Sequence, residues 1–141
     1  MRFMIIVKSI PAFEADPTPM PDEKLLAEMG AYHEALAQAG VLLDAAGLQP
    51  TRKGWRIRYG GADGQTRSVT DGPFAESKEL IAGYTLIQVR SREEAMEWAR
   101  RFPNPVGEGQ PAEIEVRQLF EMDDFPPSPP IDRMKAIGVG V

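Results

Sequence analysis

The chain has 141 residues, enough for one compact domain, and its 43% hydrophobic and 26% charged residues are ordinary for a folded globular protein. It has no cysteine, which excludes disulfides and thiolate chemistry, and a single histidine, which excludes a multi-histidine metal site within one chain. The net charge of −5 argues against nucleic acid as a partner, and the apolar run at residues 4–7 is far shorter than the about 20 residues that cross a bilayer. We therefore expect a cytoplasmic domain with no secretory leader and no membrane contact.

The N-terminal part of the chain predicts a strand, a helix and a second strand. Residues 2–8 are apolar on both faces, as in a central strand that is covered on each side. A proline-rich loop follows, and Pro21 suits the first position of a helix. Gly40 is the residue expected to end this helix, and residues 41–43 predict a short strand. The apolar stripe of the helix has helical spacing and consists of Leu25, Met29, Tyr32, Leu36 and Ala39.

The middle of the chain predicts a hairpin. Trp55, Ile57 and Tyr59 alternate with arginines, which favours a half-buried strand. The glycine-rich residues 60–64 reverse the chain, and residues 65–70 return as the partner strand. The Asp-Gly-Pro-Phe segment that follows interrupts any strand ladder, because proline lacks a backbone donor.

The C-terminal part predicts two further strands, a helix and a tail. After a strand at residues 83–90, Ser91 and Glu94 form a capping box for a helix that Pro103 ends. The buried face of that helix is expected to be Ala95, Trp98, Ala99 and Phe102. Residues 112–120 alternate as a last strand. The domain is expected to span residues 1–121, with a proline-rich tail at residues 122–141 that is stiff and extended at first, then loose, and has a packing or spacer role.

This order of elements predicts an α+β, ferredoxin-like fold: two helices on one face of a mainly antiparallel sheet, with an extra hairpin strand. The first strand would place Met4 and Ile6 opposite Phe3, Ile5 and Val7, so that both sheet faces are apolar. An apolar sheet face that no helix covers usually marks an interface. We therefore expect a homodimer that packs through its sheet faces as a dimeric α/β barrel, with a cavity between the sheets.

Two residues are candidates for catalysis. His33 falls at the border of the first helix's apolar stripe, and histidine is the side chain best suited to acid–base chemistry near neutral pH. The alternative is an ordinary boundary histidine. Asp71 stands at a strand end, where it would act as a catalytic carboxylate or, alternatively, only form a turn. Their spacing does not decide whether they meet; if they did, the carboxylate would orient the ring.

Charged residues of the last predicted strand are candidates for ligand binding. Glu113, Glu115 and Arg117 share one face, which would look into the cavity of a face-to-face dimer. There Glu115 and Arg117 would hold a polar ligand, and Phe74 would be a further ligand contact. The alternative is a set of solvated charges on an edge strand. The sequence contains no phosphate loop, dinucleotide fingerprint or nucleophile elbow, so neither a cofactor nor a metal is expected.

Residues 69–79 read Val-Thr-Asp-Gly-Pro-Phe-Ala-Glu-Ser-Lys-Glu and are followed by Gly83-Tyr84. This run strongly resembles the DGPF branch of the YCII-related family, and shorter matches extend the resemblance over residues 2–120. The resemblance implies a dimeric ferredoxin-like α/β barrel and a His–Asp pair of the kind proposed for the YCII branch. Asp71 matches its motif position directly, whereas the histidine of the YCII branch lies about one turn before His33. The shorter matches are at residues 39–42 (Ala-Gly-Val-Leu), 47–50 (Gly-Leu-Gln-Pro), 93–99 and 114–117 (Ile-Glu-Val-Arg).

The resemblance implies two classes of function. Relatives that look like lyases or dehydrohalogenases of ring compounds imply a cofactor-free proton-transfer or lyase-type enzyme acting on a small polar or aromatic molecule. In it Asp71 would orient or act as base, His33 would be its acid–base partner, and Arg117 would hold an anionic group. The frequent position of DGPF genes beside extracytoplasmic sigma-factor genes implies the alternative, a non-enzymatic ligand-binding or accessory protein linked to sigma-factor regulation.

Overall fold

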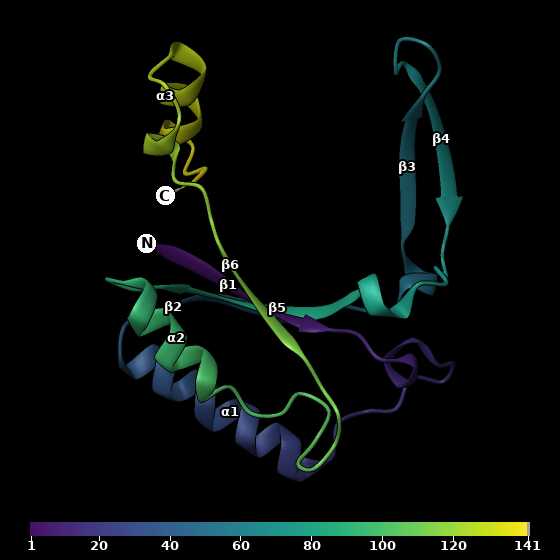
Figure 1. Cartoon of the computed structure of the whole chain (residues 1–141), viewed down its shortest axis with the longest axis vertical. Coiled ribbons are helices and arrows are strands. Elements are labelled where there is room, and N and C mark those ends of the chain that lie inside the picture. The colour runs from purple at the N-terminus through teal and green to yellow at the C-terminus, as the bar shows by residue number, and fades with distance from the viewer. Residues whose placement is uncertain (141) are drawn as a thin grey trace.

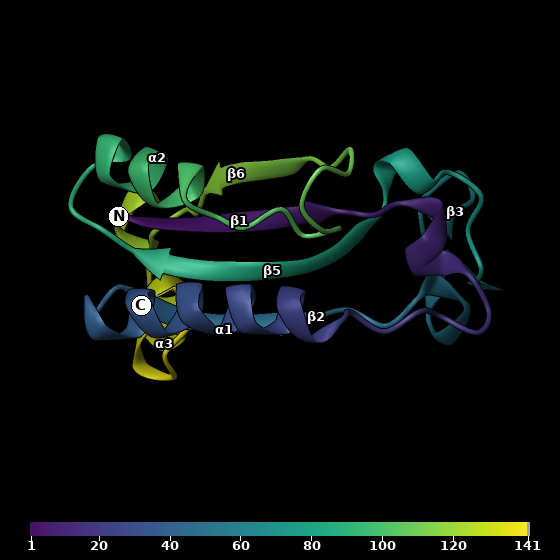
Figure 2. The same cartoon turned by 90° about the horizontal axis from the view of Figure 1, so that it is seen from below.

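The computed structural model describes residues 1–140, apart from the side chain of Ser77. A four-stranded antiparallel sheet in the order β2-β5-β1-β6 carries α1 and α2 on one face (Figures 1 and 2). This arrangement confirms the predicted ferredoxin-like α+β fold. In chain order, the strands and helices are β1 (Arg2–Lys8), α1 (Glu23–Gln38), β2 (Leu42–Gly47), β3 (Trp55–Gly60), β4 (Thr66–Asp71), β5 (Ile81–Gln88), α2 (Arg92–Arg100), β6 (Ile114–Gln118) and α3 (Pro129–Ala136).

The strand β1 lies in the middle of the sheet, paired with β5 on one side and β6 on the other. Its apolar residues on both faces suit this central place. Phe3 and Ile5 are buried beneath the helices, whereas Met4 and Ile6 point to the opposite face and stay partly exposed. The rest of the core comes from the helices and the neighbouring strands: Tyr32, Leu36, Val41, Ile87, Val89 and Ala95.

The first helix begins later than its sequence suggests. Asp22 is the N-cap, and its carboxylate accepts a hydrogen bond from the backbone amide of Leu25 at 2.8 Å. Pro21, predicted at the first helical position, therefore lies just before the cap. The carboxylate prevails because it satisfies an amide that has no partner within the helix. Gly40 follows the end of α1 with a φ of 74°, as predicted.

The β3–β4 hairpin forms a separate two-stranded sheet that projects from one end of the central sheet (Figure 1). We call residues 55–71 the arm. The prediction of a half-buried strand is wrong for the single chain, because Trp55, Ile57 and Tyr59 are 64%, 47% and 61% exposed. The alternation does give the arm one apolar face, but the described part of the chain leaves that face uncovered.

The C-terminal segment is folded, contrary to the expectation of an extended and then loose tail. A helical turn at Met122–Asp124 is followed by α3, whose first positions are occupied by prolines. Proline is favoured there because the first amides of a helix have no partner in any case. An ion pair between Lys135 and Asp123 ties α3 to the turn. This C-terminal unit, residues 120–140, rises from the same side of the sheet as the arm but at the opposite end (Figure 1).

In residues 1–140, none of the helices is long and apolar enough to span a membrane.

Candidate functional site

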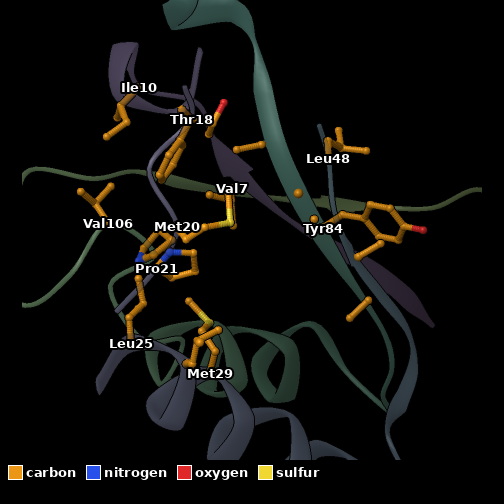
Figure 3. A pocket seen from close by; sticks show the side chains of 18 of the residues that line it. Val7, Ile10, Thr18, Met20, Pro21, Leu25, Met29, Leu48, Tyr84 and Val106 are labelled. Atoms are coloured by element: carbon orange, nitrogen blue, oxygen red, sulfur yellow. The ribbon is translucent and has the colours of Figure 1, made fainter. Parts of the chain in front are cut away.

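A cavity of about 760 Å³ lies on the helix-covered face of the sheet, where α1 begins (Figure 3). The loop between β1 and α1 forms one wall, because its prolines lack the backbone donors needed to join the sheet. The strands β2 and β5 form another wall. Most of the lining is apolar and includes Val7, Ile10, Met20, Leu25, Met29 and Val106.

His33 contributes a polar group to this cavity from α1. Its Nδ1 lies 2.8 Å from the backbone oxygen of Met29, and its Nε2 lies 2.8 Å from Oγ1 of Thr85. A carbonyl oxygen only accepts hydrogen bonds, so Nδ1 carries a proton. In the neutral ring, Nε2 is therefore the acceptor, and the Thr85 hydroxyl donates to it.

Aromatic rings hold the imidazole in place. The centroids of Tyr32 and Phe102 lie 5.5 and 6.3 Å from that of His33, both in edge-to-face contact. The Tyr32 hydroxyl donates to the backbone oxygen of Trp98 at 2.7 Å, which ties α1 to α2. Burial raises the pKa of Tyr32 to about 12, so its phenol stays neutral over the physiological range.

Thr85 was missed at the sequence level. It is 2% exposed, lies on β5, and lines the cavity together with His33. The sequence does contain a signal for it: Thr85 is a polar residue that alternates with Gly83 and Ile87, and therefore lies on the same inward face of the strand. A buried hydroxyl at such a position needs a hydrogen-bond partner, and His33 supplies it.

An exposed ion pair outside the cavity connects two elements that line it. Lys24 of α1 donates to Glu108 at 2.6 Å, which joins α1 to the loop that carries Val106. This hydrogen bond raises the pKa of Lys24 and lowers that of Glu108.

Asp71 lies elsewhere, at the base of the arm. It is the last residue of β4, pairs with Trp55 across the hairpin, and is exposed. It is outside the lining of the cavity that contains His33. Within one chain, the structure therefore does not bring Asp71 and His33 together, and the catalytic role of Asp71 stays a prediction.

The Asp-Gly-Pro-Phe segment joins the arm to the body. The amide of Gly72 donates to the backbone oxygen of Gly54 at 3.0 Å. A Cβ at position 72 would lie 1.8 Å from the backbone oxygen of Thr51, so this close approach requires glycine. The amide of Phe74 donates to Thr51 Oγ1 at 3.0 Å, and the Arg56 guanidinium lies 3.8 Å from the centroid of the Phe74 ring.

The same threonine connects the base of the arm to the loop that walls the cavity. Glu14 accepts hydrogen bonds from the Thr51 amide at 2.9 Å and from the Thr51 hydroxyl. Arg52 donates to the backbone oxygen of Ala15 at 2.9 Å and to Thr18 Oγ1 at 3.1 Å. The cavity wall and the arm are therefore fixed to each other through residues 51 and 52.

Glu115 and Arg117 lie on the sheet face opposite the helices. They pair with Ile6 and Met4 across the β1–β6 ladder, so all four side chains share that face. Arg117 and Glu115 form an ion pair at 3.3 Å, with exposed side chains. Glu115 and Arg117 share one face as predicted, whereas Glu113, predicted on the same face, lies just before the start of β6. The roles of Glu115, Arg117 and Phe74 as ligand contacts stay predictions.

Among the residues that the structure describes, there is no group of three or more histidine, aspartate or glutamate side chains placed to hold a metal ion.

Comparison with known proteins identifies the family of the chain. Residues 1–123 match the YCII-related domain, a stretch that contains His33, Thr85 and the Asp-Gly-Pro-Phe segment. An uncharacterised protein of Rhizobium meliloti (strain 1021) is 32% identical over 105 residues, which are 74% of this chain and 82% of the relative. The extent of the domain match and the identity to this relative show that the chain belongs to the YCII-related family.

Proposed function

We propose that the protein is a homodimer that binds a small, mainly apolar molecule in the cavity of each chain and exchanges a proton with it through Thr85 and His33. The observation that carries this proposal is the hydrogen bond between Thr85 Oγ1 and His33 Nε2 in the wall of an otherwise apolar cavity. Membership of the DGPF branch of the family is part of the same proposal.

The cavity supports a particular class of ligand. Its volume of about 760 Å³ lies within the range of small-molecule sites, roughly 300–1,000 Å³. The apolar walls favour an aromatic or alicyclic body, because burying apolar surface is the main driving force available there. Because the Thr85 hydroxyl already donates to His33 Nε2, Thr85 Oγ1 keeps a lone pair that can accept one hydrogen bond from the ligand.

The hydrogen bonds around His33 support proton transfer. A proton leaving a bound ligand would pass to Thr85 Oγ1 while the hydroxyl proton of Thr85 moves to His33 Nε2. The imidazolium so formed would keep its Nδ1 hydrogen bond to the Met29 oxygen, which is stronger when the donor is charged. Return of the proton to a different carbon would complete an isomerisation. In an elimination, the C–H electron pair would form the new double bond, the bond to the leaving group would break, and the leaving group would take up the proton. No cofactor takes part in this scheme.

The apolar sheet face supports the homodimer. Met4, Ile6 and Leu86 lie on the face opposite the helices and are partly exposed. Two such faces in contact would remove this surface from water. Glu115 and Arg117 on the same face would then border the space between the sheets, as the sequence predicts for residues that hold a polar ligand.

Solvent exchange tests the proton-transfer proposal. Cyclohexanone serves as the probe, and proton NMR in D₂O follows the loss of its α-protons. We expect the wild-type protein to accelerate this exchange, and both His33→Gln and Thr85→Val to remove the acceleration. Arg100→Gln, an exposed charge on α2 outside the cavity, is the control and should exchange like wild type.

Other results of the exchange and binding measurements would contradict specific parts of the proposal. A thermal shift with cyclohexanone but no exchange would support a binding protein and contradict proton transfer. Neither a shift nor exchange, with cyclohexanone or with benzaldehyde as a second binding probe, would contradict the proposed ligand class. An Asp71→Asn variant with wild-type exchange would contradict the catalytic role predicted for Asp71.

A further inference from the structure

We propose that the arm of each chain docks against the C-terminal unit of a second copy of the same chain. This inference rests on the homodimer of the proposed function and deepens it by naming the contact. It does not depend on the chemistry of the cavity.

The arm has an apolar face that lacks a partner. Ile57 pairs with Val69, and Tyr59 pairs with Arg67, so these residues share one face of the hairpin with Trp55. Trp55 and Val69 are 64% and 65% exposed. A two-stranded hairpin is at best marginally stable by itself, so an arm of this length is expected to be covered by another surface.

The arm has a small net positive charge, although the chain as a whole is acidic, because its three arginines outnumber Asp63 and Asp71. Arg56 and Arg58 lie on the face opposite Trp55, and Arg67 lies over the Tyr59 ring at 4.8 Å. In residues 1–140, none of these three arginines pairs with a carboxylate. The arm therefore presents positive charge that the chain's own acidic groups leave unneutralised.

The C-terminal unit has the complementary properties. Phe120 and Ile137 are 72% and 79% exposed, and Phe125 lies 5.3 Å from Phe120 between ring centroids. The unit's acidic residues outnumber its basic residues, Arg133 and Lys135. They are Glu121, Asp123, Asp124 and Asp132. Glu121 and Asp123 already pair with Arg2 and Lys135, so Asp124 and Asp132 are the acids that the described ion pairs leave for a partner. The C-terminal unit therefore offers apolar side chains and negative charge, which complement the apolar side chains and arginines of the arm.

The fold places these two surfaces where one rotation brings them together. The arm and the C-terminal unit rise from the open side of the sheet at opposite ends (Figure 1). When two open faces meet about a two-fold axis perpendicular to the plane of Figure 1, the ends are exchanged. Each arm then lies beside the C-terminal unit of its partner, and the contact forms twice.

Charge disfavours the other face-to-face arrangement. A two-fold axis along the long direction of the sheet would place arm against arm. The unneutralised Arg58 and Arg67 of both copies would then approach each other, and such like-charge contacts oppose association. The second copy is therefore expected to dock with its ends exchanged.

Cross-linking tests this geometry, because the chain has no cysteine of its own. Tyr59→Cys marks the arm, and Ile137→Cys marks the C-terminal unit. The two variants are mixed, allowed to exchange subunits, and treated with a short bismaleimide. We expect a cross-link between position 59 of one chain and position 137 of the other, identified by mass spectrometry. Tyr59→Cys mixed with Glu97→Cys, on the helix-covered side, is the matched control and should give none.

The outcomes distinguish failure of the proposed docking contact from failure of the homodimer itself. A monomeric mass by light scattering at micromolar concentration would overturn both. A dimer in which the only cross-link joins the two arms through position 59 of each chain, or in which the tagged positions do not cross-link, would overturn the docking of arm on C-terminal unit alone.

Charge reversal provides a second measurement without cysteines. Arg67, which pairs with Tyr59, is the arginine on the apolar face of the arm. Arg67→Glu should weaken the dimer by at least about tenfold in Kd, and Asp132→Arg in the same chain should restore part of that loss. Arg100→Glu, an exposed charge on α2, is the control and should leave the Kd unchanged. Equal dissociation constants for Arg67→Glu and Arg100→Glu would contradict the proposed contact.

Discussion

Arg2 and Glu121 join the first strand to the start of the C-terminal unit. Arg2 Nε lies 3.1 and 3.0 Å from the two carboxylate oxygens of Glu121, and a second guanidinium nitrogen donates to the Phe120 oxygen at 3.3 Å. The Arg2 side chain is only 9% exposed, so it depends on these acceptors. The contact fixes the direction in which the chain leaves the sheet after β6.

Glu121→Gln is expected to weaken this junction. Loss of the carboxylate leaves a largely buried guanidinium without its charged partner, and we expect the free energy of unfolding to fall by about 1.5–3 kcal/mol. Residues after 120 should also become more sensitive to limited proteolysis. Urea unfolding and mapped cleavage sites measure the two effects. Glu115→Gln, which breaks an exposed pair, should change stability by less than about 1 kcal/mol, and an equal loss in both variants would contradict this account.

Gly72→Ala is expected to distort the base of the arm. The added Cβ would lie 1.8 Å from the Thr51 oxygen, so the two backbones must separate, at a cost of about 1–3 kcal/mol or more. Gly30→Ala is the matched control, because its Cβ meets nothing within 4 Å and alanine favours a helix by about 0.5–1 kcal/mol. Thermal unfolding should show the first variant destabilised and the second stabilised. Similar melting temperatures for the two would rule out the close contact.

The tautomer of His33 is a direct test of the site. In the neutral ring, we expect the proton on Nδ1 and a lone pair on Nε2 that accepts from Thr85. Long-range ¹⁵N–¹H correlation spectra distinguish the two nitrogens, and having one histidine makes the assignment unambiguous. A neutral ring protonated at Nε2 would show that the Met29 and Thr85 contacts are not those described.

Thr85→Val removes the hydroxyl while nearly preserving the shape of the side chain. Nε2 of His33 then loses its donor in a partly buried position, and we expect a loss of about 0.5–1.5 kcal/mol in unfolding free energy. Thr85→Ser keeps the hydroxyl and should retain the ¹⁵N shift of Nε2 even where it lowers stability. A wild-type Nε2 shift in Thr85→Val would show that the hydroxyl does not donate to the ring.

Because of Tyr32, we expect the free energy of unfolding to fall at alkaline pH. Burial raises its pKa from 10.0 to about 12, so the folded protein favours the neutral phenol. The contribution of the neutral Tyr32 phenol to the free energy of unfolding is fully present below pH 10, which is its pKa in the unfolded chain. This contribution is lost as the pH rises towards about 12. Tyr32→Phe should show a smaller decline across this window, measured by urea unfolding at several pH values. An equal decline in wild type and variant would show that Tyr32 does not ionise differently on unfolding.

The central fold could be predicted because its signals are local. β1 is apolar on both faces, Gly40 ends α1, and the Ser91 hydroxyl accepts from the Glu94 amide at the start of α2. Each of these signals depends on a few neighbouring residues. The C-terminal helix α3 had a local signal too, since Ser128 precedes two prolines at the helix start, but the high proline content favoured an extended segment.

The site was harder to predict because it depends on contacts between distant residues. His33 and Thr85 are far apart in the sequence, and only the packing of α1 on β5 brings them within 2.8 Å. The exposure of the arm has a different cause. The alternation at Trp55, Ile57 and Tyr59 correctly indicates one apolar face, but it does not specify whether the same chain covers that face.

The alternation of β5 gives neighbouring residues opposite surroundings. Thr85 points towards α1 and bonds to His33, whereas the ring of Tyr84 extends to the other side of the strand and its hydroxyl donates to Asp44 at 2.9 Å (Figure 3). Point substitutions can therefore change one face of the sheet and leave the other intact. Inserting or deleting a single residue in β5 would instead exchange the two sets of side chains. Insertions and deletions in β5 are therefore expected to be tolerated far less during evolution than substitutions of its individual side chains.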